Sequence, residues 1–330
     1  MQPDPLMRRL IYIIGLILAL GACAAPPQAQ TRVSESSADI AELWQEPVDL
    51  LQRDLLAGPG GAALMPRGDT PYEFVSFKTS GTNPGYTLRD TSGRIWSVKL
   101  GIEAQSEVTT SRILWALGYH QPAAYYLPEF TVSGLGPLGG TKQQGRFRTD
   151  LDPWRPGAEW SWYENPFANT QPFRGLVVAQ LILNAWDLKT PNNRIYYVVD
   201  PSTLPGRQFV VRDVGASLGE ARQFALFNRL GTRGLQGSKN NIDDFESQGF
   251  ITAVDGNDVE FDYRGVNGAL VDMLTVADVI WACERFAQIP DAHWQAAFQA
   301  GAYPADVAGR YIRKIKEKIA QGLALRRIPT

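Results

Sequence analysis

An apolar run that ends in a polar loop is the feature that most constrains this chain. Residues 175–183 read Gly-Leu-Val-Val-Ala-Gln-Leu-Ile-Leu, and the chain turns polar at Asp187. The surrounding stretch from Phe173 to Trp186 is long enough for a buried helix but shorter than a membrane span. We therefore expect a helix within a hydrophobic core that delivers Asp187 at its end.

Polar residues at a suggestive separation follow that helix. An amide lies five residues after a carboxylate in Asp187-Leu188-Lys189-Thr190-Pro191-Asn192, and Arg212-Asp213-Val214-Gly215 follows the strand-like run 208–211. Phosphoryl transfer needs an acidic group to orient the acceptor hydroxyl and oxygen ligands to hold magnesium ions. Asp187, Asn192 and Asp213 supply those groups. Lys189 would add positive charge where the transferred phosphoryl group develops negative charge.

Together the two motifs resemble the catalytic loop and the metal-binding motif of protein-kinase-like enzymes, the superfamily of protein, lipid and toxin-type kinases. The resemblance covers roughly residues 70–320. It implies an α+β fold with two lobes, a small N-lobe built mainly of antiparallel sheet and a larger, mainly helical C-lobe. It also implies that Asp187 is the catalytic base and that Asn192 and Asp213 bind Mg²⁺ or Mn²⁺. Asn193 is an alternative ligand if the register of the loop differs by one residue.

The region before these motifs has the residue pattern of short strands separated by turns. Strands are expected at 72–77, 86–89 and 95–100, followed by a helix from Ser106 to Leu117 that ends at Gly118. The resemblance places the lysine that contacts nucleotide phosphates at Lys99, held by Glu107, with Glu103 as a rival partner. ATP or another nucleotide is the phosphate donor that the resemblance implies.

Three features depart from the family pattern. The turn 81–85 is only loosely similar to a Gly-rich phosphate loop, and Lys99 lies much closer in sequence to Glu107 than in protein kinases. Ala185-Trp186 replaces the usual His-Arg before the catalytic Asp. Without that Arg, the chain lacks the customary partner of a phosphorylated activation loop, so regulation of that kind is not expected.

The N-terminus resembles a bacterial lipoprotein signal. Arg8 and Arg9 precede the apolar stretch 10–20, and Cys23 follows Leu20-Gly21-Ala22. In the family pattern the chain is cleaved before Cys23, which receives lipids, and Ala24 favours sorting to the outer membrane, facing the periplasm. A plain secretory signal or an N-terminal anchor is the alternative. All three interpretations predict an exported protein.

Several other site classes find little support. Cys283 falls on the apolar face of a predicted helix and is expected in the core, while His120 and His293 have no neighbouring cysteines, so a zinc site is not expected. The formal net charge of −2 gives no electrostatic argument for binding nucleic acid.

Two regions allow more than one interpretation. Trp154, Trp160, Trp162 and Tyr163 either pack at the junction of the lobes, which we prefer, or line a ligand pocket. Residues 128–150 are expected to hold a Gly-containing loop and a strand at 144–148. Residues 218–268 are expected to be an activation-segment equivalent and a variable surface, with basic residues at Arg222, Arg229, Arg233 and Lys239.

The C-terminal region predicts helices at 275–288, 291–300 and 304–323. The last helix combines an apolar stripe with basic residues on the opposite side, at Arg310, Arg313, Lys314 and Lys318. A solvated basic face on a helix that closes the core is the preferred interpretation. A helix that lies on anionic lipid headgroups is the alternative.

The expected organisation is a signal peptide at 1–22, a tether at 23–40, an N-terminal helix and N-lobe at 41–150, and a C-lobe at 151–330. The predicted function is metal-dependent phosphoryl transfer from a nucleotide to an unknown acceptor, which is a protein, a lipid or a small molecule. The alternative is an inactive, kinase-like binding or scaffold lipoprotein of the cell envelope. A different phosphate donor is a third hypothesis, because the periplasm is expected to lack an ATP supply.

Overall fold

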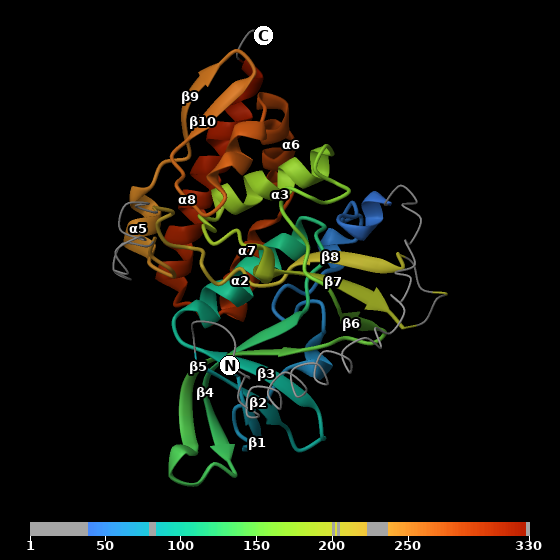
Figure 1. Cartoon of the computed structure of the whole chain (residues 1–330). Coiled ribbons are helices and arrows are strands. Elements are labelled where there is room, and N and C mark those ends of the chain that lie inside the picture. The colour runs from blue at the N-terminus through green and yellow to red at the C-terminus, as the bar shows by residue number, and fades with distance from the viewer. Residues whose placement is uncertain (1–38, 79–83, 200–201, 203–204, 223–236, 328–330) are drawn as a thin grey trace, which may run out of the picture. The chain divides into compact units, whose positions relative to one another are not determined.

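A closed five-stranded barrel follows three short 3-10 helices in this mixed α/β protein (Figure 1). The computed structural model describes residues 39–78, 84–199, 202, 205–222 and 237–327. The short helices are Ile40–Glu42, Leu50–Gln52 and Ala62–Leu64. The barrel strands are β1 (Tyr72–Phe77), β2 (Gly85–Arg89), β3 (Ile95–Leu100), β4 (Ala123–Ser133) and β5 (Gly140–Thr149). Their order is β1-β2-β3-β5-β4, and a parallel pairing of β1 with β4 closes the barrel.

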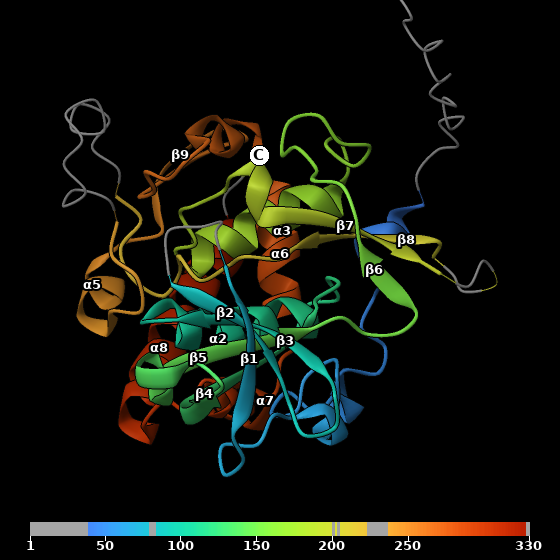
Figure 2. The same cartoon turned by 60° about the horizontal axis from the view of Figure 1, so that its bottom comes forward.

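Alternation along β3 and β5 separates an apolar face from a charged one. Trp96, Val98 and Phe147 are at most 1% exposed and belong to the barrel core. Because successive strand residues point to opposite faces, Lys99 and Arg146 lie on the other face, where the register pairs them directly. Helix α2 (Glu103–Ala116) packs against β3, β4 and β5 (Figure 2). Its Glu103 and Glu107 bring carboxylates to Lys99 on that charged face.

A helical core with two small sheets follows the barrel in sequence. The helices are α3 (Gln171–Ile182), α5 (Ile242–Ser247), α6 (Val276–Ala287), α7 (Asp291–Ala300) and α8 (Ala305–Ala324). The 3-10 helices are Thr190–Asn192, Gly268–Met273 and Leu325–Arg327. The strands are β6 (Trp154–Pro156), β7 (Asn193–Val198) and β8 (Arg207–Val211) in one sheet, and β9 (Ile251–Asp255) and β10 (Asp258–Phe261) in the other. Helix α3 packs on α6 and α8, and residues 176–179 are at most 1% exposed, as expected for a buried helix.

Most elements expected from sequence periodicity are present, with small shifts at their ends. The strands at 72–77 and 95–100 and the helices near 275–288, 291–300 and 304–323 are confirmed. The expected loop around residue 134 was wrong in part, because β4 and β5 form a long hairpin from Ala123 to Thr149. Within residues 218–268, expected to be an activation-segment equivalent and a variable surface, α5 and the β9–β10 hairpin form.

The positions of two buried side chains, Lys318 and Cys283, test expectations from the sequence. Lys318 does not belong to a solvated basic face. It is 2% exposed and donates to the carbonyl of Ile182 and to Asn184 Oδ1, because α8 turns that position toward the end of α3. Cys283 is buried in the core, as predicted.

The predicted boundary between residues 150 and 151 stays a prediction, and residues 38–330 form one structural unit. None of the helices in the described part of the chain is long and apolar enough to cross a membrane. The signal peptide, Cys23, nearly all of the expected tether, Arg229 and Arg233 lie outside the described residues, as does most of the turn 81–85.

Candidate active site

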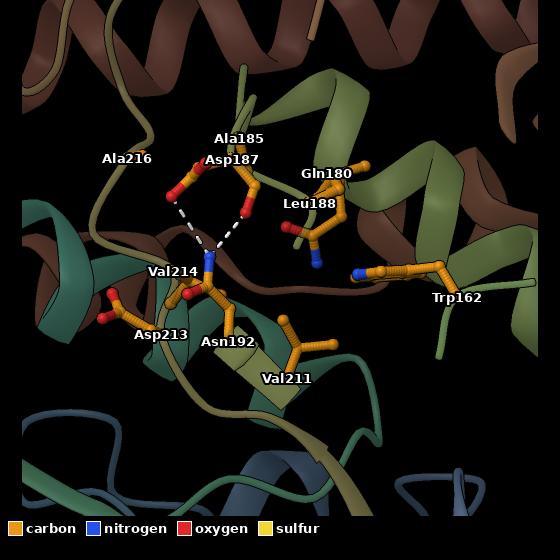
Figure 3. Close-up of a pocket in the computed structure, with 10 residues that line it drawn as sticks. All are labelled: Trp162, Gln180, Ala185, Asp187, Leu188, Asn192, Val211, Asp213, Val214 and Ala216. Carbon is orange, nitrogen blue, oxygen red and sulfur yellow. Dashed lines mark hydrogen bonds between the residues drawn. The ribbon is translucent and has the colours of Figure 1, made fainter. Parts of the chain in front are cut away.

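The loop after α3 and the segment after β8 meet through backbone hydrogen bonds. The amides of Arg212 and Asp213 both donate to the carbonyl of Asn192, at 2.8 and 3.0 Å. Asn192 ends a 3-10 turn, and Asp213 lies two residues beyond the last residue of β8. These contacts bring together an amide and a carboxylate that are 21 residues apart in sequence. Figure 3 shows Asp213 beside Asn192.

Asp187 is held by its neighbours in the same loop. The side-chain nitrogen of Asn192 donates to the Asp187 carbonyl at 2.5 Å and to its Oδ2 at 3.3 Å (Figure 3). Lys189 Nζ lies 2.7 Å from Asp187 Oδ1, and the Lys189 side chain is about half exposed. Because Asn192 donates through nitrogen, its Oδ1 is left to face other groups. Helix α3 ends at Ile182, so Asp187 follows the helix by a short loop rather than at its last residue.

Lys99 is surrounded by three carboxylates. Its Nζ lies 2.6 Å from Glu103 Oε2, 3.3 Å from Glu107 Oε2 and 3.0 Å from both carboxylate oxygens of Asp213. Glu107 therefore contacts Lys99, as the family resemblance implies, and so does the rival partner Glu103. This arrangement joins the barrel, α2 and the segment after β8 at one point.

The charges in this cluster shift one another's ionisation. Burial acts to lower the pKa of Lys99, but the carboxylates of Glu107, Asp213 and Glu103 outweigh burial and hold the pKa above its ordinary value. Burial acts to raise the pKa of Asp213, yet Lys99, Arg148 and Arg146 hold it well below its ordinary value. The carboxylate of Asp213 is thus held in its ionised form by its cationic neighbours.

Two buried arginines on β5, absent from the sequence-based prediction, complete the cluster. Arg146 Nε lies 2.8 Å from Glu107 Oε1, and Arg148 forms a short ion pair with the same oxygen. Arg148 also donates to the carbonyl of Arg212 at 2.7 Å. A signal for them exists in the sequence, because Arg146-Phe147-Arg148 alternates charged and aromatic residues in a predicted strand. The two arginines reach the cluster only because β5 pairs with β3, and the local sequence does not reveal that pairing.

These groups line one cleft of about 430 Å³. Its wall contains Asp187, Lys189, Asn192, Asp213 and Lys99, together with Lys78, Arg146, Arg148, Arg194, Arg212, Lys239, Glu103, Glu159, Pro84, Gly85 and Pro191. Eight basic side chains thus face four carboxylates, and this excess of basic groups favours an anionic ligand. Burial and the nearby Arg146, Arg148 and Arg212 lower the pKa of Lys78 to about 7.

The oxygen donors at the cleft fit a magnesium or manganese ion. Mg²⁺ is commonly bound by one or two side-chain oxygens together with substrate phosphates rather than by an all-protein cage. The Asp213 carboxylate and Asn192 Oδ1 provide such a partial set. No group of three or more His, Cys, Asp or Glu side chains able to hold a metal occurs among the described residues.

The alternative ligand Asn193 lies elsewhere. It is fully buried, and its side-chain nitrogen donates to the carbonyl of Trp160 at 3.0 Å. Trp160 and Trp162 are themselves at most 4% exposed and pack in the helical core. These two tryptophans are packing residues of the helical core, whereas Tyr163 is 46% exposed, and packing at a junction of lobes stays a prediction. Asn192 rather than Asn193 lines the cleft.

Comparison with known proteins gives structural likenesses only. No protein-family model matches the chain, and no curated protein sequence matches it. Among solved structures, a Helicobacter pylori proinflammatory kinase, CtkA, is similar over 78% of this chain and 96% of its own, at 10% identity and a TM-score of 0.46. The Golgi casein kinase is similar over 78% of this chain and 74% of its own, at 9% identity and a TM-score of 0.42.

Proposed function

We propose that this chain is a metal-dependent phosphotransferase with a two-lobed, kinase-like fold. The observation that carries the proposal is the contact of Lys99 Nζ with both oxygens of Asp213, 114 residues away, in the cleft that also contains Asp187 and Asn192. A lysine for phosphates, oxygen ligands for a metal and a carboxylate for the acceptor are the parts that phosphoryl transfer requires.

Each side chain has a distinct role in this proposal. The acceptor hydroxyl donates its hydrogen bond to Asp187, which orients the hydroxyl and accepts its proton. Lys189 neutralises charge on the transferred group. Lys99 contacts the donor phosphates once its ion pair with Asp213 is broken. Mg²⁺ or Mn²⁺ held by Asn192 and Asp213 would supply further positive charge to the phosphate oxygens. Glu103 and Glu107 hold Lys99 in place.

The proposal includes export and lipid anchoring through Cys23, at the outer membrane facing the periplasm. Its support is the pattern of Arg8, Arg9, the apolar stretch 10–20 and Cys23. Mass spectrometry of the N-terminal peptide of the mature protein tests it. A lipidated Cys23 as the first residue is expected, and an unmodified Cys23 within a longer peptide would contradict the anchor.

Calorimetric titration of the protein with ATP at fixed Mg²⁺ tests the site. We expect Mg²⁺-dependent binding that Asp213→Ala weakens at least about tenfold, because the variant loses a metal ligand. Asp187→Asn should leave binding intact and slow phosphoryl transfer by about a hundredfold or more, because it removes the base.

The matched control is Asp306→Ala, which removes an exposed carboxylate at the start of α8. It should bind as the parent protein does. Unchanged affinity in Asp213→Ala would eliminate the metal assignment. Failure of the parent protein to bind any phosphate donor would favour the inactive binding lipoprotein instead.

A further inference from the structure

A second hollow of about 710 Å³ adjoins the cleft. Four arginines line it, Arg94, Arg148, Arg155 and Arg212, and we call it the arginine hollow. Arg148 and Arg212 also line the cleft, so the two cavities share a wall. A ligand bound in the cleft beside Arg148 and Arg212 therefore lies next to residues that also line the hollow.

The arginine hollow extends away from the acceptor side. Asp187 and Lys189 line the cleft but not the hollow. The hollow instead continues along β3 and the end of β5, past Ser97 and Thr149. A donor whose reacting phosphate lies near Asp187 would place its far end in the hollow.

Positive charge in and beside the hollow is only partly neutralised by protein carboxylates. Within the described part of the chain, the side chains of Arg94 and Arg212 form no ion pair with a carboxylate. Asp150 and Asp152 also line the hollow, and Asp152 Oδ1 pairs with Arg155 at 2.5 Å. Arg148 pairs with Glu107, so Arg94 and Arg212 are the two arginines of the hollow that are available for an anionic ligand.

Two of these arginines also have unused donors. The Nε atoms of Arg148 and Arg212 are buried and have no hydrogen-bond partner among the described residues. Arg148 is only 5% exposed, so its guanidinium is held in place rather than free in solvent. Both side chains line the hollow, and a phosphate group is the natural bidentate acceptor for arginine.

The lining offers little to a nucleobase. Ile95 is the only large apolar side chain of the arginine hollow, and no aromatic residue of the described chain lines either cavity. Sites for organic cofactors are lined predominantly by apolar and aromatic side chains. The chemistry of these walls therefore suits a chain of phosphates rather than a base and a sugar.

We propose that the phosphate donor is linear inorganic polyphosphate, bound through its phosphates along the cleft and the arginine hollow. This inference rests on the proposed function and names the donor for the same site. The acceptor hydroxyl oxygen attacks the terminal phosphorus, and the bond from that phosphorus to the bridging oxygen breaks. The departing chain, one phosphate shorter, keeps the bridging oxygen, and Asp187 accepts the hydroxyl proton.

Calorimetry of the purified full chain at fixed Mg²⁺ and ionic strength distinguishes the donors. The probes are ATP, tripolyphosphate, which has the same number of phosphates without a nucleoside, and a longer linear polyphosphate. We expect ATP and tripolyphosphate to bind within about threefold of each other, and the longer chain at least about tenfold more tightly. Arg94→Ala should weaken the longer chain about tenfold and leave tripolyphosphate unchanged.

Arg313→Ala is the matched control, because it removes an arginine that is 65% exposed on α8 and lines neither cavity. It should bind every probe as the parent protein does. ATP binding more than about tenfold tighter than tripolyphosphate would overturn the polyphosphate inference and leave the proposed function standing. The inference would also be overturned if the longer polyphosphate bound no more tightly than tripolyphosphate, or if Arg94→Ala did not weaken its binding. If the parent protein binds none of the probes in a manner that requires both Mg²⁺ and Asp213, the proposed function is eliminated, and this inference with it.

Discussion

Lys99 and Lys318 are both buried lysines with opposite surroundings. Lys99 faces three carboxylates, and its pKa is held above the ordinary value. Among the described residues, Lys318 donates to a carbonyl and to Asn184 Oδ1, and the ring of Phe245 lies 4.6 Å from its Nζ. Burial, together with nearby Lys314, lowers the pKa of Lys318 to about 7, although Asp262 acts in the opposite sense. Neighbouring charge, more than burial alone, decides whether a lysine stays protonated.

Lys318→Met should flatten the rise of stability with pH. The folded pKa of Lys318 is about 7, below the 10.5 of an unperturbed lysine, so between these pH values the unfolded chain binds a proton that the folded chain has released. Stability therefore rises with pH through that window. Denaturant unfolding between pH 7 and 9 should show a gain larger by about 2 kcal/mol in the parent protein than in the variant.

The control is Lys316→Met, since Lys316 is 44% exposed and pairs with Asp291 at the surface. Its pH dependence should match that of the parent protein. Equal slopes in Lys318→Met and the parent protein would show that Lys318 stays charged in the folded state.

Helix α2 links the barrel to the segment that contains Asp213. Its buried hydroxyls reach that segment, because Ser106 Oγ donates to the carbonyl of Gly215 at 2.7 Å and Thr110 Oγ1 lies 2.8 Å from Ser217 Oγ. The same helix carries the two glutamates that contact Lys99. At its end, Trp44 Nε1 donates to the carbonyl of Leu117 at 2.7 Å. The position of α2 thus sets the geometry of the candidate site.

Gly118→Ala should displace the end of α2 and destabilise the fold. Gly118 has φ +97°, and a Cβ there would lie 2.1 Å from the Gln45 carbonyl oxygen and 2.7 Å from Trp44 Nε1. Unfavourable φ and the clash together should cost about 3 kcal/mol or more in denaturant unfolding. Gly93→Ala is the control, because Gly93 has φ +85° with no atom within 4 Å of the added Cβ. It should cost only about 1 kcal/mol. Equal costs would mean that the contact of Gly118 with residues 44–45 is unimportant.

At the scale of the whole molecule, the segment 39–57 belongs to the helical core although it precedes the barrel in sequence. Leu43 is 1% exposed and packs in the same cluster as α3, α6 and α8. The guanidinium of Arg285 lies 3.8 Å from the ring centroid of Trp281 and 5.5 Å from that of Trp44. The core therefore contains residues from both ends of the described chain, and the fold requires contacts of long sequence separation.

Leu43→Ala should lower the free energy of unfolding by about 2 to 5 kcal/mol, because it removes buried methyl groups and leaves a cavity. Leu51→Ala, from the same segment, should change it by less than about 0.5 kcal/mol, because Leu51 is 72% exposed. Thermal or denaturant unfolding measures both. A small effect of Leu43→Ala would show that the segment is not part of the cooperative core.

Local pattern predicted much of this molecule. The apolar run at 175–183 predicts α3, alternation predicts β1 and β3, and the spacing of Asp187, Asn192 and Asp213 points to one site. These features depend on side-chain periodicity and on neighbours in sequence, so the sequence alone reveals them. Strand β4 was missed because Pro128 and nearby glycines are also typical of loops.

By itself, the sequence determined most of the elements and several of the residue types of the site, and only the tertiary structure decided which of them meet. The pairing of β3 with β5 places Arg146 opposite Lys99, 47 residues away, and shifting that register by one residue would turn both arginines of β5 into the barrel core. The packing of α8 on α3 likewise buries Lys318, which helical periodicity placed on an exposed face. Both outcomes depend on contacts between distant segments, whose energies no local pattern contains.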